Sequence, residues 1–309
     1  MKRWLFFCAG LLLLGVVARA LPIYYVGLLS QALIFGIFAM SLNLLLGYTG
    51  LPSLGHSAYF GTAAYATAVL SLRVSESFWL NAPGGVLLSV IIAGVYGLLA
   101  LRTAGVYFLM ITLALAQVLW GIALSWRGMT GGDNGLAGIP RPDLGLPLSL
   151  WDTHNFFYFV LVAFALMAAA MYVLVNSPFG YALRGIRENE TRMRVLGYNV
   201  WLYKYLAFVI AGMFAGVAGV LFVYHNGFVS TSELSVVLSA KALLMVILGG
   251  AGTLFGPVLG AGVVVFLSHI VSAYTGRWLL VLGTVYVLVV LFAPLGILKG
   301  LQARLRVVV

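Results

Sequence analysis

The sequence has very little charge and a single cysteine. Of its 309 residues, 63% are hydrophobic and only 8% are charged, whereas about 25% of the residues in a soluble globular domain are charged. Water is therefore not the main solvent for this chain. Because Cys8 is the one cysteine and lies within the first apolar run, an intrachain disulfide and a cysteine metal cluster are excluded.

The motifs of common enzymes and nucleotide-binding proteins are missing as well. No G-x-x-x-x-G-K-[ST] phosphate loop, H-E-x-x-H pair, G-x-S-x-G elbow or paired carboxylates occur, and the histidines lie far apart. Lys241 is the charged residue that falls in the middle of an apolar run, so the buried carboxylates typical of ion-coupled pumps are not evident either. We expect no catalytic residues, no metal site and no cofactor bound by this chain.

What the sequence does have is a succession of apolar runs, each long enough to cross ~30 Å of hydrocarbon as a helix. They predict an all-α, polytopic transmembrane bundle of about ten spans in a single domain, residues 1–309. The expected spans are 4–21, 23–46, 56–72, 84–101, 105–125, 156–176, 205–225, 236–250, 254–275 and 278–295. Segment 236–250 is short and ends in glycines, so it is either a continuous span or a re-entrant one.

The positive charge is explained by membrane topology. The net charge of +10 is carried by residues in the connections between apolar runs, which the positive-inside rule explains without nucleic acid. The distribution of Lys and Arg places both termini in the cytoplasm, in a multi-pass protein of the bacterial inner membrane. The N-terminus also resembles a signal peptide, with Ala18-Arg19-Ala20 near a cleavage position, but we favour a retained helix.

The inner connection 177–204 predicts a short helix lying across the cytoplasmic face. Ser177 is a suitable N-cap, Pro178 suits the first helical position, and Gly197 can end the helix. Acid-to-base pairs four residues apart support it: Glu188 with Arg192, and Glu190 with Arg194. Ile186, Met193 and Leu196 could enter a groove on a partner protein. The alternative is an ordinary solvated helix.

Several polar residues are candidates for a transport path. They are Asn43, Ser53 in the charge-free segment 47–55, His56, Gln117 and Lys241. For the amides and His56 the alternative is hydrogen bonding between packed helices. Lys241 either binds the carboxylate of a substrate or snorkels toward the membrane surface. In the outer connection 126–154, the glycine-rich stretch after Met129 is either an anion-binding turn or a plain surface turn.

Five ordered blocks carry a resemblance to a known family. The blocks are SLNLLLGYTGLPSLGHSAYFGTAAYA at 41–66, GVYFLMITLALAQ at 105–117, TGGDNGLAGIPRP at 130–142, RENETRMRVLGYNVWLYKYLAFVIAGMFAGVAGVL at 187–221, and MVILGGAGTLFGPVLGA at 245–261. Together they resemble the permease family of branched-chain amino acid ABC importers, in particular its LivM-type subunit. Lys241 departs from the family, which often has an acidic residue near this point.

The resemblance implies an ABC-importer fold and a set of partners. These are a second, LivH-like permease subunit, two ABC ATPase subunits that hold ATP and Mg, and a periplasmic binding protein that delivers the amino acid. It implies that 177–204 is the coupling segment, with Arg187, Glu188, Asn189, Glu190, Met193, Leu196 and Gly197 at the ATPase interface. The candidate contact with the binding protein is Thr130, Gly131, Gly132, Asp133 and Asn134.

Two other functions stay open at this stage. The same fold could import urea or short amides, since the sequence does not identify the cargo. A stand-alone secondary transporter or channel is the second alternative, although the scarcity of intramembrane carboxylates argues against it.

Overall fold

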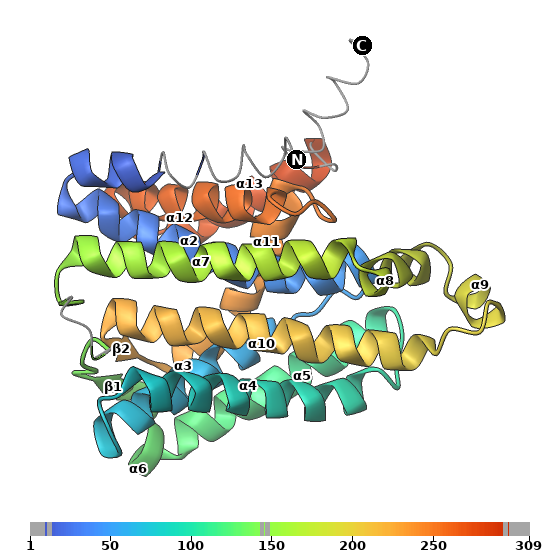
Figure 1. Ribbon diagram of the computed structural model, residues 1–309, viewed down its shortest axis with the longest axis horizontal. Helices are drawn as coiled ribbons and strands as arrows, with labels where there is room; N and C mark the ends of the chain where they lie inside the picture. Colours follow the sequence, from blue (N-terminus) through green and yellow to red (C-terminus); the bar gives the residue numbers. More distant parts are fainter. Residues whose placement is uncertain (1–9, 11–13, 143–144, 146–148, 293–295, 297–309) are drawn as a thin grey trace, which may run out of the picture.

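The computed structural model describes residues 10, 14–142, 145, 149–292 and 296, and most of these are helical (Figure 1). The long helices are α2 (Ile23–Asn43), α3 (His56–Arg73), α4 (Phe78–Ala100), α5 (Val106–Ser125), α7 (Thr153–Asn176), α10 (Val200–Asn226), α11 (Val236–Gly249), α12 (Gly256–Tyr274) and α13 (Trp278–Phe292). Most of them run along the long axis of the molecule (Figure 1).

Shorter elements gather at the two ends of this bundle. At one end, which we call the sheet end, lie α6 (Arg127–Thr130), the 3-10 helices η2 (Gly132–Asn134) and η3 (Thr231–Leu234), and the strands β1 (Leu136–Ala137) and β2 (Phe228–Val229). The strands pair antiparallel, with Leu136 opposite Val229. At the other end, the α9 end, lie α8 (Pro178–Glu188), α9 (Glu190–Val195) and the π-helix η1 (Leu44–Thr49) that continues α2 (Figure 1).

Six of the described helices are long and apolar enough to cross a membrane: α2 with η1, α4, α5, α7, α10 and α12. The prediction of a helical membrane bundle is confirmed. The expected count of about ten spans is not confirmed, because α3, α11 and α13 are too short or not apolar enough by this criterion and half of segment 4–21 lies outside the described residues.

Some predicted helix ends differ from those observed. Helix α4 begins at Phe78 rather than at 84 and contains Pro83, while α10 begins at Val200 rather than at 205. Pro83 is the sixth residue of α4, beyond the first four amides that have no partner within the helix, so it removes one hydrogen bond of the second turn. The side chain of Asn199 accepts a hydrogen bond from Leu202 N and so starts α10 before the apolar run begins.

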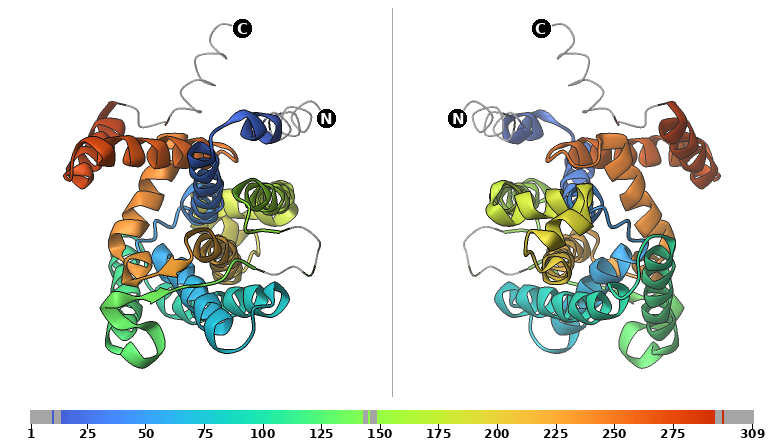
Figure 2. Two further views of the ribbon diagram at one scale, coloured as in Figure 1. Left: turned by 90° about the vertical axis from the view of Figure 1, so that its left-hand side faces the viewer. Right: turned by 90° about the vertical axis from the view of Figure 1, so that its right-hand side faces the viewer.

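The centre of the bundle is formed by α2, α3 and α10 (Figure 2). Of the residues in the most apolar stretch of each candidate span, 89% are buried in α2 with η1 and 72% in α10. The corresponding share is 22–33% in α4, α5, α7 and α12. Glycines let α10 approach its neighbours: a Cβ at Gly219 would overlap the carbonyl of Phe60 in α3, and one at Gly212 would overlap Ala93 in α4. These glycines therefore let the helices pack closely.

Helix α11 differs from the rest because it runs steeply across the bundle (Figures 1 and 2). It has 14 residues, so it is about 21 Å long and shorter than the ~30 Å of a hydrocarbon core. It is continuous over its length and ends at Gly249, just before Gly250, whose φ of 108° is unfavourable for any side chain. This crossing helix carries Lys241.

Candidate functional site

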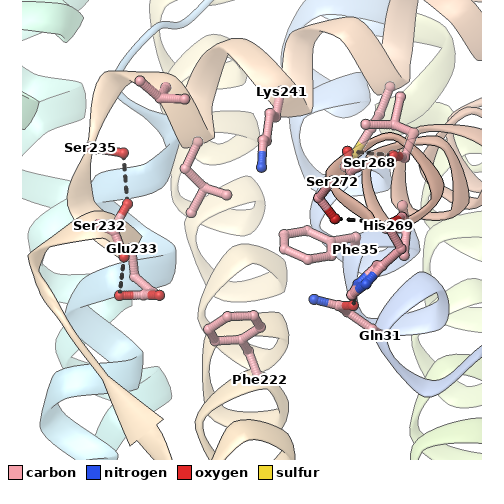
Figure 3. Close-up of a pocket in the computed structure, with 15 residues that line it drawn as sticks. Gln31, Phe35, Phe222, Ser232, Glu233, Ser235, Lys241, Ser268, His269 and Ser272 are labelled. Carbon is pink, nitrogen blue, oxygen red and sulfur yellow. Dashed lines mark hydrogen bonds between the residues drawn. The ribbon is translucent and has the colours of Figure 1, made fainter. Parts of the chain in front are cut away.

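A cavity of about 490 Å³ lies against α11 (Figure 3). Its walls come from five elements that are far apart in the sequence: α2, the end of α10, η3, α11 and α12. The Lys241 side chain points into this space, with Glu233 to one side and His269 to the other (Figure 3). We call it the Lys241 cavity.

The polar groups of the Lys241 cavity are held by hydrogen bonds. Glu233 Oε2 accepts from Ser230 N at 2.9 Å, from Ser230 Oγ at 3.0 Å and from Ser232 Oγ at 3.1 Å, which forms a capping box on η3. On the opposite side, His269 Nε2 lies 2.7 Å from Gln31 Oε1. These contacts fix the positions of an acidic group and of an amide–imidazole pair around the cavity.

Apolar side chains form the rest of the wall. Phe35 and Phe222 meet edge to face with ring centroids 5.7 Å apart, and both line the cavity (Figure 3). Leu238, Met245, Val264 and Val265 complete this apolar part. The cavity thus combines a few placed polar groups with a mainly apolar surface, which is typical of a site for a small organic molecule.

A second cavity, of about 500 Å³, shares Val237 and Lys241 with the first. It is lined also by Ser53, by Leu109 in the first turn of α5, and by Tyr286. The first turn of α5 lies toward the α9 end, whereas the second half of α12 lies toward the sheet end (Figure 1). This half of α12 contains Ser268 and Ser272 of the Lys241 cavity. Lys241 therefore stands where two cavities displaced toward opposite ends of the bundle meet.

The predicted path residues divide into two groups. Ser53 and Lys241 are brought together at the second cavity. Asn43, His56 and Gln117 line neither cavity. His56 is fully buried, and its Nε2 lies 2.7 Å from Ser41 Oγ, while Gln117 is partly buried on α5.

Asn43 joins the end of α2 to the turn between α11 and α12. Its Nδ2 donates to Thr253 O at 2.8 Å, and its Oδ1 accepts from Gly252 N at 2.8 Å. A Cβ at Gly47 would overlap both Asn43 and Gly252, so the two segments touch without an intervening side chain. Asn43 thus links α2 mechanically to the turn that ends α11.

The inner connection contains two helices rather than the single one predicted. Ser177 caps α8 and Pro178 opens it, as expected. The helix then ends at Asn189, whose extended backbone and side chain start α9 by accepting from Arg192 N at 2.9 Å. Gly197, with φ of 87°, follows the end of α9, as predicted. The break arises because an N-capping asparagine competes with continuing the helix.

Charged and apolar side chains attach α9 to the rest of the chain. Glu190 forms ion pairs of 2.5 Å with Arg194 and with Lys204 of α10. Burial raises the pKa of the Glu190 carboxyl, but hydrogen bonds and charge from Lys204 and Arg194 outweigh it and hold that pKa below its ordinary value. Met193 is buried, in contrast to the expectation that it would enter a partner's groove, whereas Leu196 is 64% exposed.

Met193 and Ile186 belong to a small apolar cluster with Ala182 and Val200. Because α8 and α9 are separate helices, they fold against each other and bury these side chains. Helix α8 also contacts η1: Arg187 donates to Gly47 O, and the Arg184 guanidinium lies 5.2 Å from the centroid of the Tyr48 ring. A chain of contacts therefore runs from α8 through η1 and Asn43 to the end of α11.

At the sheet end, the glycine-rich stretch is half buried. Thr130 Oγ1 donates to Trp126 O at 2.9 Å, and Gly131 and Gly132 have φ of 74° and 61°. Thr130 and Gly132 are buried, while Asp133 and Asn134 are exposed. The stretch is a rigid turn whose exposed part is acidic and polar. Among the described residues, no group of three or more His, Cys, Asp or Glu side chains is placed to hold a metal ion.

A bundle of apolar helices with two cavities that meet at a lysine is the architecture expected of a membrane transport protein. Comparison with protein families gives the same class. Residues 24–295 match the family described as "Branched-chain amino acid transport system / permease component". The chain belongs to this family of ABC transporter permeases, whose members are generally not enzymes.

Individual relatives agree with the family. The high-affinity branched-chain amino acid transport system permease protein LivM of Salmonella typhimurium (strain LT2) is 32% identical over 322 residues, which cover 96% of this chain and 76% of that protein. LivM of Escherichia coli (strain K12) is 31% identical, covering 91% and 71%. The ribose import permease protein RbsC of Haemophilus influenzae is 24% identical, covering 85% and 83%. No solved structure matches the chain.

The site residues that sequence reasoning missed are Gln31, Glu233 and His269. Gln31 and His269 are polar residues within apolar runs, which is a signal of intramembrane function. Glu233 lies between the predicted spans, and Ser230 three residues before it is the signature of a capping box. Nothing in the sequence indicates that these three side chains line one cavity.

Proposed function

We propose that this chain is the membrane-spanning permease subunit of an ATP-driven importer, and that it carries branched-chain or related hydrophobic amino acids delivered by a periplasmic binding protein. In this proposal the sheet end faces the periplasm and the α9 end faces the cytoplasm. The chain crosses the membrane about ten times, with both termini in the cytoplasm. ATP and Mg bind to separate ATPase subunits, and this chain binds no cofactor.

The observation that supports this function best is the place of Lys241 between two cavities. A carrier exposes one site to either side of the membrane in turn, by rocking or gating of packed helices. The Lys241 cavity lies toward the sheet end and the second cavity toward the α9 end, with Val237 and Lys241 of α11 in both walls. A modest movement of α11 could connect Lys241 to one cavity and close it from the other.

The contacts at the α9 end supply a route for the force from ATP hydrolysis. Leu196 and Glu188 are exposed there and are available to an ATPase. A shift of α8 would move η1 through Arg187 and then, through Asn43, the turn that ends α11. Such π-helical turns occur frequently at functional sites. The exposed turn residues Asp133 and Asn134 would meet the binding protein at the opposite end.

The relatives named LivM, together with a LivH relative in Methanocaldococcus jannaschii that is 25% identical, support pairing with a second permease. The complete transporter would then contain this chain, a LivH-like subunit and two ATPases. Selection among cargoes would rest largely with the binding protein.

The proposal is tested by purifying the tagged chain from its native membrane and identifying its partners by mass spectrometry. We expect a second permease and an ATPase with a phosphate loop. Reconstituted in liposomes with the binding protein, this complex should take up L-leucine only when ATP is present. Recovery of the chain alone, or solute flux without ATP, would instead identify a stand-alone transporter or channel, and ATP-driven uptake of urea would identify a different cargo.

A further inference from the structure

We propose that the Lys241 cavity binds the zwitterion of an α-amino acid: Lys241 takes its carboxylate, Glu233 takes its ammonium group, and Phe35 with Phe222 contact its apolar side chain. This inference rests on the proposed function and adds a binding site within the permease itself. It assigns roles to Glu233, Phe35 and Phe222 that concern recognition of the cargo.

The Lys241 cavity is lined by two side chains of opposite charge. A cation and an anion from different elements, Lys241 on α11 and Glu233 on η3, line one cavity (Figure 3). Charged side chains are costly in a membrane protein and usually mark pathways or binding sites. A free amino acid carries the same two charges, and a cavity with both signs can compensate each of them.

The Glu233 carboxylate is held in place through one of its two oxygens. Its described hydrogen bonds to Ser230 and Ser232 all fall on Oε2. They fix the carboxylate in place as part of the capping box, and Oε1 is left for an ammonium group. A positioned carboxylate loses less conformational entropy when it binds a cation than a mobile one does.

The wall of the cavity is mainly apolar. Phe35, Phe222 and the aliphatic residues of α11 and α12 make most of the surface. The cavity volume of about 490 Å³ lies within the range of ~300–1,000 Å³ found for small-molecule sites. Such a wall favours an aliphatic side chain, since a polar one would lose hydrogen bonds to water without replacement. The expected ligands are therefore amino acids such as leucine, isoleucine and valine.

The test measures equilibrium binding of three ligands to the assembled permease–ATPase complex in lipid nanodiscs, without the binding protein. The ligands are L-leucine, L-leucinamide, which lacks the carboxylate, and 4-methylpentanoate, which lacks the amino group. In the unaltered complex, L-leucine should bind at least about tenfold more tightly than either analogue, because each lacks one charge-assisted hydrogen bond.

Variants of Lys241 and Glu233 then test which charged group of the ligand each side chain binds. In Lys241→Met, L-leucine and L-leucinamide should bind with nearly equal affinity, whereas Lys241→Arg should keep the preference. In Glu233→Gln, which retains the capping box, L-leucine and 4-methylpentanoate should become nearly equal. Matched controls are Arg277→Met and Glu76→Gln, exposed positions outside the cavity, and both should behave as the unaltered complex.

The outcomes separate this site from the wider proposal. If Lys241→Met or Glu233→Gln weakens the matched pair of ligands equally, or leaves both unchanged, the assignment of that charge is wrong. If such variants still assemble and support ATP-driven uptake of leucine with an unchanged KM, the zwitterion site is overturned while the importer function stands. Failure of the unaltered chain to assemble with an ATPase would instead contradict the proposed function.

Discussion

The α9 end and the Lys241 cavity use charged side chains in different ways. At the α9 end, Glu190 pairs with Arg194 and Lys204, and Arg187 binds the backbone of η1, so these charges join one segment of the chain to another. In the cavity, Lys241 and Glu233 face an open volume large enough for a small molecule. The first arrangement suits the transmission of movement, and the second suits recognition of a charged ligand.

The chain of contacts between the two regions depends most on Asn43, so its loss should have the largest effect. In Asn43→Leu, Gly252 N and Thr253 O lose their partners inside the protein, at a cost of about 1–3 kcal/mol for each group. We expect a clear fall in the apparent unfolding temperature and in uptake. Asn176→Leu is the control, because Asn176 is exposed and bonds within its own helix. Equal behaviour of the two variants would contradict the role of Asn43.

Substitutions of Met193 and Leu196 should have different effects, the first on the stability of the fold and the second on binding of the ATPase. Met193→Ala removes a buried side chain from the cluster with Ile186 and should cost about 2 kcal/mol or more. Leu196→Ala should leave unfolding unchanged, because Leu196 is exposed, but should weaken association with the ATPase. Thermal unfolding and pull-down of the ATPase measure the two effects. The reverse pattern would show that Met193, not Leu196, faces the partner.

Removing the charge of Glu190 should have a smaller effect. In Glu190→Gln the pairs with Arg194 and Lys204 are lost, but both lie partly in solvent, where such pairs contribute about 1 kcal/mol or less. We expect faster amide hydrogen exchange over residues 190–197 and little change in exchange around α11. Exchange that rises equally in residues 190–197 and around α11 would indicate that the α9 end and the Lys241 cavity do not unfold independently.

The pH dependence of the same contact should be the smallest effect. Because the pKa of Glu190 is held below its ordinary value, its contribution to folding is fully present above the ordinary carboxyl pKa and is lost as the pH falls through the lowered one. Protection of the α9 amides against exchange, measured relative to the intrinsic rate at each pH, should therefore be insensitive to this group between about pH 6 and 8 and should fall only below about pH 4. Glu190→Gln should remove that fall, and a fall that persists in this variant would have another cause.

Local chemistry let the sequence predict much of the secondary structure. The long apolar runs gave helices α5, α7 and α12 with nearly the expected bounds, and Ser177, Pro178 and Gly197 marked helix ends correctly. The break at Asn189 was missed, because the residues on both sides of it favour a helix. Burial of Met193 and Ile186 and the ion pairs of Glu190 stabilise two helices in place of one.

The candidate site was predicted less completely, because it is assembled from distant segments. Lys241 stood out as a charge within an apolar run, and the structure places it in a cavity wall. Gln31 and His269, 238 residues apart, meet only in the folded chain. Asn43 was chosen, like Lys241, as a polar residue within a span, and His56 was chosen because it follows the charge-free segment 47–55. Both are buried in helix packing, since a polar residue of this kind can line a pathway or form a hydrogen bond between helices.

Alternating exposure of the two cavities that meet at Lys241 is the central claim. Its most direct test is thiol labelling in the assembled transporter, with Cys8→Ser providing a cysteine-free chain. Ser268→Cys reports on the Lys241 cavity and Ser53→Cys on the second cavity. When ATP is trapped on the ATPases, the account predicts that labelling by a water-soluble maleimide rises at one position and falls at the other. Labelling that stays constant, or changes in the same direction at both positions, would contradict it.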